Sequence, residues 1–136
     1  MKFIETPIKD LWIIEPTVFE DSRGYFFESF NKRTFKKGTG LNIDFVQDNQ
    51  SKSEYGVLRG MHWQEGEHAQ AKLVSVLEGA VQDIAVDLRP NSPTYGQYYS
   101  IILSAENKTQ FFVPRGFAHG FLVLSETAVF SYKCDN

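Results

Sequence analysis

The chain has 136 residues, the usual length of one domain, and its 42% hydrophobic and 23% charged residues are ordinary for a globular protein. A net charge of −3 with no polybasic run argues against duplex nucleic acid or an anionic membrane surface as a partner. No segment resembles a signal peptide or a membrane span, and the lone Cys134 cannot form an internal disulfide. We therefore expect a single cytoplasmic domain over residues 1–136.

Short apolar or alternating runs separated by turn residues predict an all-β protein. The expected strands are Trp12 to Glu15, Gly24 to Phe30, Asp44 to Gln50, Gly56 to Gln64, Lys72 to Leu77, Ala80 to Asp87, Tyr98 to Leu103, Gln110 to Val113, Gly120 to Leu124 and Thr127 to Lys133. The one expected helix is a short turn from Lys32 to Lys37, closed by Gly38. Glu78-Gly79 predicts a tight hairpin, and Pro90 to Pro93 and Ser125-Glu126 mark other reversals. So many strands in a short chain favour a sandwich or jelly roll with a ligand cavity between its sheets.

Two of the predicted strands bring a histidine and two cations into segments that have the character of buried strands. These segments are Leu58-Arg59-Gly60-Met61-His62-Trp63-Gln64 and Gln70-Ala71-Lys72-Leu73-Val74. Burial and the nearby cations disfavour a charged imidazolium, so we expect His62 to stay neutral and able to accept a proton at pH 7. A neutral histidine beside fixed positive charge suits a general base whose product is an anion.

Each candidate residue also has a plainer interpretation. A lone histidine in an apolar strand is more often a hydrogen-bonded core residue, and His119 divides evenly between packing and ligand contact. Lys72 can extend from a strand end to reach solvent, and most tyrosines placed like Tyr132 only pack. His68 lies in a polar loop and is expected at the surface.

Polar residues elsewhere suit a phosphorylated or hydroxylated ligand. Arg23 and Arg59 can each bind phosphate oxygens bidentately, and neither has a helix cap or surface salt bridge as a simpler explanation. Gln47 and Asn49 share one face of an alternating strand, while Asp48 points to the other. Phe26 and Glu28 likewise lie on a common face of the expected strand from Gly24 to Phe30, where the plainer interpretation is an amphipathic strand covering the core.

Two landmarks resemble the conserved motifs of the cupins. These are Gly60-Met61-His62-Trp63-Gln64 with Gly79 downstream, and Val113-Pro114-Arg115-Gly116-Phe117-Ala118-His119-Gly120. Gln64 occupies the place of the second metal-binding histidine of many cupins, and His62 and His119 have no clear third ligand, so we expect no metal.

Six blocks in order, which together span essentially the whole chain, narrow the resemblance to the dTDP-4-dehydrorhamnose 3,5-epimerase family. The blocks are Asp21-Ser22-Arg23-Gly24-Tyr25-Phe26, Gln47-Asp48-Asn49, Leu58 to Gln64, Ala69 to Val74, Leu103 to Lys108 and Phe117 to Ser125. The resemblance implies a metal-free, cofactor-independent jelly-roll homodimer that acts on a dTDP-4-keto-6-deoxy sugar on the way to dTDP-L-rhamnose.

The resemblance also implies residue roles. His62 would be the base, Tyr132 the acid on the opposite face of the sugar, and Lys72 the partner of the enolate oxygen. The substrate-binding residues would be Arg23, Phe26, Glu28, Gln47, Asp48, Asn49, Arg59, Lys72 and His119, with the segment that contains Phe26 reaching the partner subunit's site.

In the family, a further segment follows the position of Asn136. It supplies a carboxylate that orients the catalytic histidine and an aromatic residue that stacks on thymine, so we expect these groups to lie outside the 136 residues, and both a fragment and a natural short form fit. Asp83 and Asp87, on a neighbouring expected strand, can approach His62 or Lys72, although a structural role is the plainer interpretation. Three functions stay open: double epimerisation, a single-site 3- or 5-epimerase, and a catalytically weak cupin that binds a nucleotide sugar.

Overall fold

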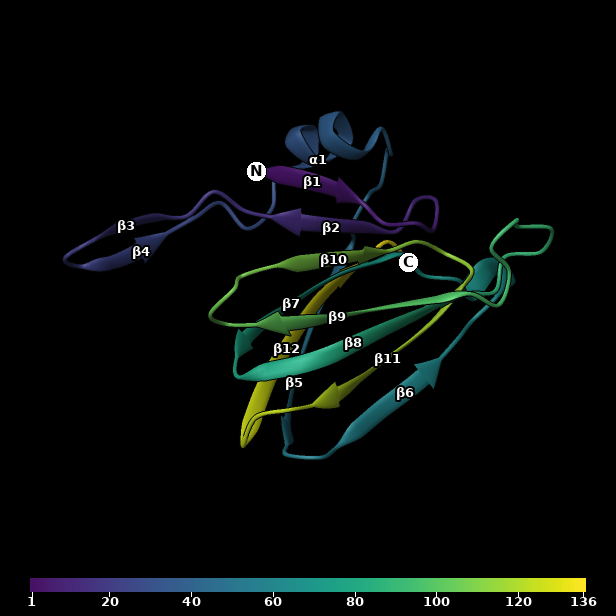
Figure 1. The fold of residues 1–136 in the computed structure, drawn as a ribbon. Coiled ribbons are helices and arrows are strands. Elements are labelled where there is room, and N and C mark those ends of the chain that lie inside the picture. Colours follow the sequence, from purple (N-terminus) through teal and green to yellow (C-terminus); the bar gives the residue numbers. More distant parts are fainter.

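The computed structural model describes residues 1–136 and consists mainly of antiparallel strands (Figure 1). In chain order the elements are β1 (Lys2–Glu5), β2 (Trp12–Glu15), β3 (Phe19–Asp21), β4 (Gly24–Phe26), α1 (Lys32–Thr39), β5 (Gln47–Glu54), β6 (Leu58–His62), the 3-10 turn η1 (Gly66–His68), β7 (Lys72–Glu78), β8 (Ala80–Asp87), β9 (Tyr98–Ser104), β10 (Gln110–Val113), β11 (Phe117–Val123) and β12 (Thr127–Cys134). The predicted all-β class is confirmed.

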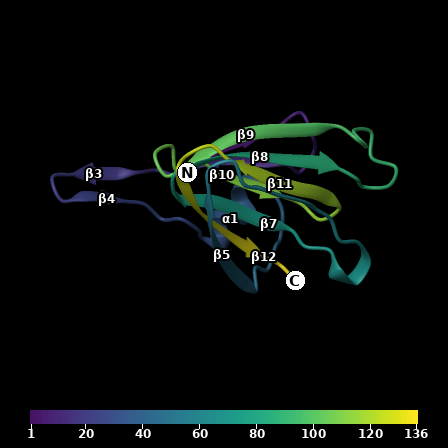
Figure 2. The ribbon, with the colours of Figure 1, turned by 90° about the horizontal axis from the view of Figure 1, so that it is seen from below.

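Two sheets form the body of the molecule. The larger has the strand order β1-β2-β10-β7-β12-β5 and the smaller has the order β6-β11-β8-β9, with every neighbouring pair antiparallel. Figure 2 shows β8, β9 and β11 stacked over β7, β12 and β5. The hairpin of β3 and β4 stands away from both sheets (Figures 1 and 2). No helix of this structure is long and apolar enough to cross a membrane.

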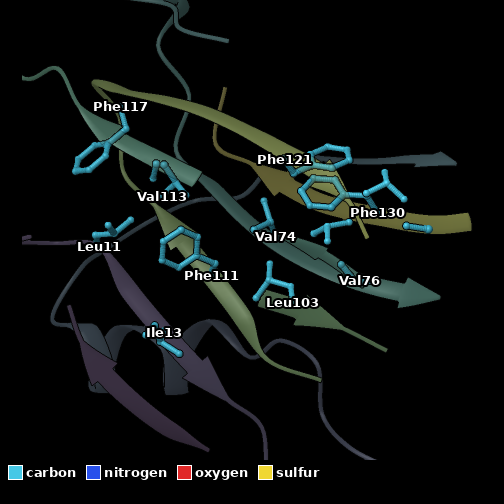
Figure 3. Packing of buried hydrophobic residues seen from close by; sticks show 14 of the residues in the cluster. Leu11, Ile13, Val74, Val76, Leu103, Phe111, Val113, Phe117, Phe121 and Phe130 are labelled. Carbon is cyan, nitrogen blue, oxygen red and sulfur yellow. The ribbon is translucent and has the colours of Figure 1, made fainter. Parts of the chain in front are cut away.

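The core lies between the two sheets and follows from the alternation of side chains along the strands. In β8, burial alternates at every second residue, which places Val81 and Ala85 against the larger sheet and leaves their neighbours partly exposed. Phe121 of β11 and Phe130 of β12 stack across the interface with ring centroids 4.0 Å apart (Figure 3). Each such buried side chain stabilises the fold by about 1.5–3 kcal/mol, so the inner faces hold the sheets together.

A second cluster packs α1 on the larger sheet through Phe35, whose ring lies 5.1 Å from that of Phe112. The helix begins at the N-cap Asn31, whose side chain accepts a hydrogen bond from Thr34 N at 3.0 Å. The predicted closure at Gly38 is wrong, because the helix continues to Thr39 and ends at Gly40 in the left-handed conformation. Gly38 serves packing instead, since a Cβ there would overlap the Phe3 ring.

The predicted hairpin at Glu78-Gly79 is also wrong, because β7 and β8 belong to different sheets. Gly79 has φ +79°, and a Cβ there would meet the carbonyl oxygen of Thr127, so the turn takes the chain across the sandwich at a crowded corner. The sequence shows two Val-rich runs and a turn, but it does not show whether the runs pair with each other.

Several strand bounds differ from expectation. The sequence does not predict β1 or β3, and β4 ends at Phe26 instead of Phe30, while β5 begins at Gln47 instead of Asp44. The short polar run of β3 has no alternating pattern, and it forms a strand only because β4 pairs with it. Strand ends depend on such partners, which lie elsewhere in the chain.

Candidate functional site

The candidate site lies at one end of the space between the sheets, where strands from both of them contribute side chains. One cavity of about 240 Å³ is lined by His62, Trp63, Gln64, Gln70, Lys72, Val113, Phe117, His119 and Tyr132. A second, of about 220 Å³, is lined by Asn49, Gln50, Ser51, Arg59, His62, Lys72, His119, Gly120, Phe121, Phe130 and Tyr132. The two cavities adjoin, because four polar residues, His62, Lys72, His119 and Tyr132, line both.

Strand register brings these four residues together. His62 and His119 are opposite each other in the pairing of β6 with β11. Tyr132 is opposite Val74, and Lys72 is opposite Cys134, in the pairing of β12 with β7. The Lys72 Nζ lies 5.2 Å from the centroid of the Tyr132 ring, within the range of a cation–π contact. Residues far apart in the sequence therefore converge on one small space.

Lys72 is half-buried, and burial lowers the pKa of its ammonium while Cys134 and Asp83 oppose the shift. The carboxyl of Asp83 thus favours the cation in a site that partly excludes water. A cation held in this way is suited to stabilising negative charge that develops on a bound molecule.

Asp83 is fully buried in β8 and lies beside His119, with its Oδ1 2.7 Å from His119 Nε2. Burial raises the pKa of the Asp83 carboxyl, against the opposing effects of His119 and Lys72. The Oδ2 of Asp83 is buried without a partner. The His119 side chain makes no other hydrogen bond within the chain, and its Nδ1 is not among the fully enclosed unpaired atoms, so Nδ1 is the ring nitrogen left for a ligand.

His62 occupies a different environment from the one that the sequence predicts. Every residue of β6 is exposed, and this strand lies at the edge of the smaller sheet, where it pairs only with β11. The expected burial of the Leu58 to Gln64 segment is therefore wrong for this chain. His62 makes no hydrogen bond to a carboxylate, and the carboxylates of Asp83 and Asp87 form their hydrogen bonds with other residues.

Asp87, the other buried acid of β8, has a structural place instead. It accepts hydrogen bonds from Arg89, Ser92 and Thr94 in the loop between β8 and β9. Burial would raise the pKa of its carboxyl, but these hydrogen bonds outweigh burial and hold the pKa well below its usual range. Arg89 extends this network to Asp10, 3.3 Å away, which ties the loop to the segment between β1 and β2.

Of the other predicted binding residues on β5 and β6, some line the second cavity and some lie outside it. Arg59 and Asn49 line the second cavity. The predicted common face of Gln47 and Asn49 is confirmed by a hydrogen bond of 3.0 Å between Gln47 Nε2 and Asn49 Oδ1. Asp48 points away and forms an ion pair with Lys133 at 3.0 Å.

Arg23, Phe26 and Glu28 are not brought to these cavities. Arg23 and Phe26 lie on the projecting β3–β4 hairpin (Figure 1), and Glu28 follows it beyond the end of β4. The expectation that Arg23 has no surface salt bridge is wrong, since its Nη2 lies 2.7 Å from Asp21 Oδ2 and its side chain is 88% exposed. The expected common strand face of Phe26 and Glu28 is also wrong, because β4 ends at Phe26.

Sequence reasoning missed the pairing of Asp83 with His119. The alternation along Ala80 to Asp87 puts Asp83 on the same face as Val81 and Ala85, so a charged residue among inward positions is the signal that pointed to it. Its partner depends on the pairing of β8 with β11 and could not be read from the alternation. No group of three or more His, Cys, Asp or Glu side chains is arranged to hold a metal ion.

The two antiparallel sheets, with a polar cavity at one end of the sandwich, define a cupin-type jelly roll. The family model for dTDP-4-dehydrorhamnose 3,5-epimerase matches residues 5–136, and the chain belongs to this family.

Known relatives agree with this assignment along the whole chain. The dTDP-4-dehydrorhamnose 3,5-epimerase of Escherichia coli K12 is 54% identical over 136 residues, which cover 100% of this chain and 74% of that protein. The crystal structure of the enzyme of that name from Elizabethkingia anophelis has a TM-score of 0.95 and 71% identity, covering 100% of this chain and 74% of that one. The crystal structure of dTDP-6-deoxy-D-glucose-3,5-epimerase from Legionella pneumophila, in complex with dTDP-4-keto-L-rhamnose, has a TM-score of 0.95 and 53% identity and covers 99% of this chain and 71% of that one.

Proposed function

We propose that this chain is the epimerase that inverts C3 and C5 of dTDP-4-dehydro-6-deoxy-D-glucose to give dTDP-4-dehydro-L-rhamnose, for the synthesis of dTDP-L-rhamnose. The observation that carries the proposal is the convergence of His62, Lys72, His119 and Tyr132 on one pair of adjoining cavities in a chain of this family. We also propose that it acts as a single cupin domain in the cytoplasm and without a metal or other cofactor.

The reaction needs two proton-transferring groups and a partner for an oxyanion. The hydrogens on C3 and C5 are acidic because the carbonyl at C4 accepts the electron pair when a proton leaves. His62 takes the proton from one face, and the electron pair moves to the C4 oxygen to form an enolate. Tyr132, from the other sheet, donates its phenolic proton to the same carbon from the opposite face, which inverts it. Solvent then takes the extra proton from His62 and returns one to Tyr132, which restores both side chains for the next turnover.

Lys72 is placed to stabilise the enolate between these steps. Its ammonium lies beside the Tyr132 ring and lines both cavities. A cation held in place against a developing oxyanion contributes several kcal/mol, on the order of 10² to 10³ in rate. His119, held through Nε2 by Asp83, presents its other ring nitrogen for a second contact to the sugar.

The nucleotide end of the substrate would lie toward β5 and β6. Arg59 offers a guanidinium for the diphosphate, and Asn49 and the neighbouring Gln47 offer amide groups. Asp48, on the opposite face and paired with Lys133, would need to leave that ion pair to bind the substrate. Phe26 and Arg23 are exposed on the projecting β3–β4 hairpin, away from the two cavities of the same subunit. We propose that in a homodimer this hairpin and Glu28 complete the site of the partner subunit.

The function is tested by proton exchange. The 136-residue chain is incubated with dTDP-4-keto-6-deoxyglucose in deuterated water, and C3 and C5 of the sugar are followed by NMR. Deuterium at both carbons with inversion is the expected result. Exchange at one carbon alone would instead identify a single-site 3- or 5-epimerase.

A second candidate is a nucleotide-sugar-binding cupin with weak or no turnover, and the exposed His62 without a carboxylate partner favours it. It predicts that the nucleotide sugar binds while neither carbon exchanges. His62→Ala separates the two, because loss of the base should abolish exchange while leaving binding nearly intact. His68→Ala, in the exposed η1 turn, is the matched control and should exchange like the wild type. Unchanged exchange in His62→Ala would show that another group is the base.

A further inference from the structure

The guanidinium of Arg59 is bound by a neutral side chain, whereas three other arginines of the chain are paired with carboxylates. Arg23, Arg89 and Arg115 each form an ion pair with an aspartate. Arg59 forms none, and its single hydrogen bond is donated by Nε to the hydroxyl of Ser53 at 2.7 Å. A neutral partner fixes the orientation of a guanidinium without neutralising its charge.

Ser53 is itself an unusual residue for its strand. It is 6% exposed, in a strand whose other residues are all half-buried or exposed. It lies on β5, the edge of the larger sheet, whereas Arg59 lies on β6, the edge of the smaller sheet. The hydrogen bond therefore spans the two sheets at the side of the second cavity, which Arg59 lines.

Most N–H groups of the Arg59 guanidinium remain free to bind a ligand. Of its five N–H groups, the one on Nε is occupied by Ser53, while the four on Nη1 and Nη2 make no hydrogen bond within the chain. Two parallel N–H groups are the arrangement that binds phosphate oxygens bidentately. An arginine whose long side chain is already oriented loses less conformational entropy when such a ligand binds.

We propose that Ser53 is a positioning residue, which holds Arg59 through Nε so that its two terminal nitrogens present an unneutralised fork to the diphosphate of a nucleoside diphosphate sugar. The inference rests on the proposed function, since that function supplies the diphosphate. It adds a residue that contacts no substrate and acts only through Arg59.

A double-mutant cycle on dTDP binding, measured by isothermal titration calorimetry, tests the proposal. Ser53→Ala is expected to weaken dTDP binding by about 5- to 10-fold, because the variant loses the one hydrogen bond that orients Arg59 before dTDP binds. Ser75→Ala, a half-buried serine of β7 that lines neither cavity, is the matched control and should bind dTDP as the wild type does. In an Arg59→Lys background, which has no Nε–H group to hold, Ser53→Ala should cause no further loss.

The outcomes separate this inference from the function on which it rests. If Ser53→Ala weakened dTDP binding equally in the wild-type and Arg59→Lys backgrounds, the positioning role alone would be overturned. The same would follow if Ser53→Ala left dTDP binding unchanged while Arg59→Lys clearly weakened it. A wild-type chain that does not bind dTDP would overturn both proposals. NMR of the wild-type Arg59 Nε–H gives a readout that does not depend on folding of the variants, because a signal that exchanges rapidly with water would contradict the hydrogen bond to Ser53.

Discussion

Replacing Asp83 by asparagine separates stability from activity in this protein. Asp83 is fully buried, and burial raises the pKa of its carboxyl above the ordinary value of 3.8 in spite of His119 and Lys72. A carboxyl whose pKa is raised by folding contributes stability that is fully present below pH 3.8 and is lost as the pH rises through the raised pKa. Each unit of the rise makes ionisation cost about 1.4 kcal/mol of folding free energy. Asparagine has the same size, keeps an oxygen for His119 Nε2 and carries no charge.

The free energy of unfolding of Asp83→Asn at pH 7 should therefore equal or exceed that of the wild type, and the difference should shrink as the pH falls toward 4. The catalytic activity of Asp83→Asn, unlike its stability, should fall. A hydrogen bond to a carboxylate is worth about 1 to 1.5 kcal/mol more than one to a neutral amide, so kcat/KM should fall by about 5- to 15-fold as His119 is held less firmly. Urea unfolding between pH 4 and pH 8, with epimerase kinetics at pH 7, measures both quantities.

Asp87→Asn is the control, because its effect on the free energy of unfolding at neutral pH should have the opposite sign. Asp87 is equally buried, but its hydrogen bonds hold its pKa below the usual range, so its contribution to stability is present above pH 3.8 and lost as the pH falls further. This variant should be destabilised at neutral pH, with the loss shrinking in acid. If Asp83→Asn instead lost more than about 2 kcal/mol at pH 7, equally at every pH, the carboxylate of Asp83 would be a structural support and the reasoning from its raised pKa would be refuted.

Two further predictions concern the proposed chemistry. Burial lowers the pKa of Lys72 below 10.5, so activity that needs its cation should decline with rising pH earlier than for an ordinary lysine, and Lys72→Arg, whose guanidinium stays charged, should move that decline to higher pH at a lower rate. An alkaline limb of kcat/KM that stays in place in Lys72→Arg would assign it to another group. Tyr132→Phe should keep deuterium exchange at C3 or C5, because His62 still removes and returns protons on its own face, but inversion should fall by about 10²-fold or more. Inversion at the wild-type rate in this variant, followed by NMR, would remove Tyr132 from the role of acid.

Local pattern was enough to predict much of the fold. The bounds of β2, β8 and β10 agree with those expected from the sequence, because alternation and turn residues act over a few neighbouring positions. The same pattern failed at Glu78-Gly79, where the turn is real but the two strands that it joins pair with other partners. It failed again for β6, whose apolar residues suggested burial although the strand lies at a sheet edge.

The candidate site shows the same division. Motif resemblance selected His62, Lys72, His119 and Tyr132 from the sequence, and the structure places all four around the adjoining cavities. Their roles in catalysis stay predictions.

The sequence by itself determined the all-β class, the family and the residue types that the chemistry requires, because these depend on short-range periodicity and on motifs of fixed spacing. Only the tertiary structure decided which groups touch: Asp83 with His119, Ser53 with Arg59, and Arg23 with Asp21 on a hairpin away from its own cavities. The first two contacts join strands far apart in the sequence or edges of opposite sheets, and burial and strand pairing, which set them, are properties of the whole packed chain.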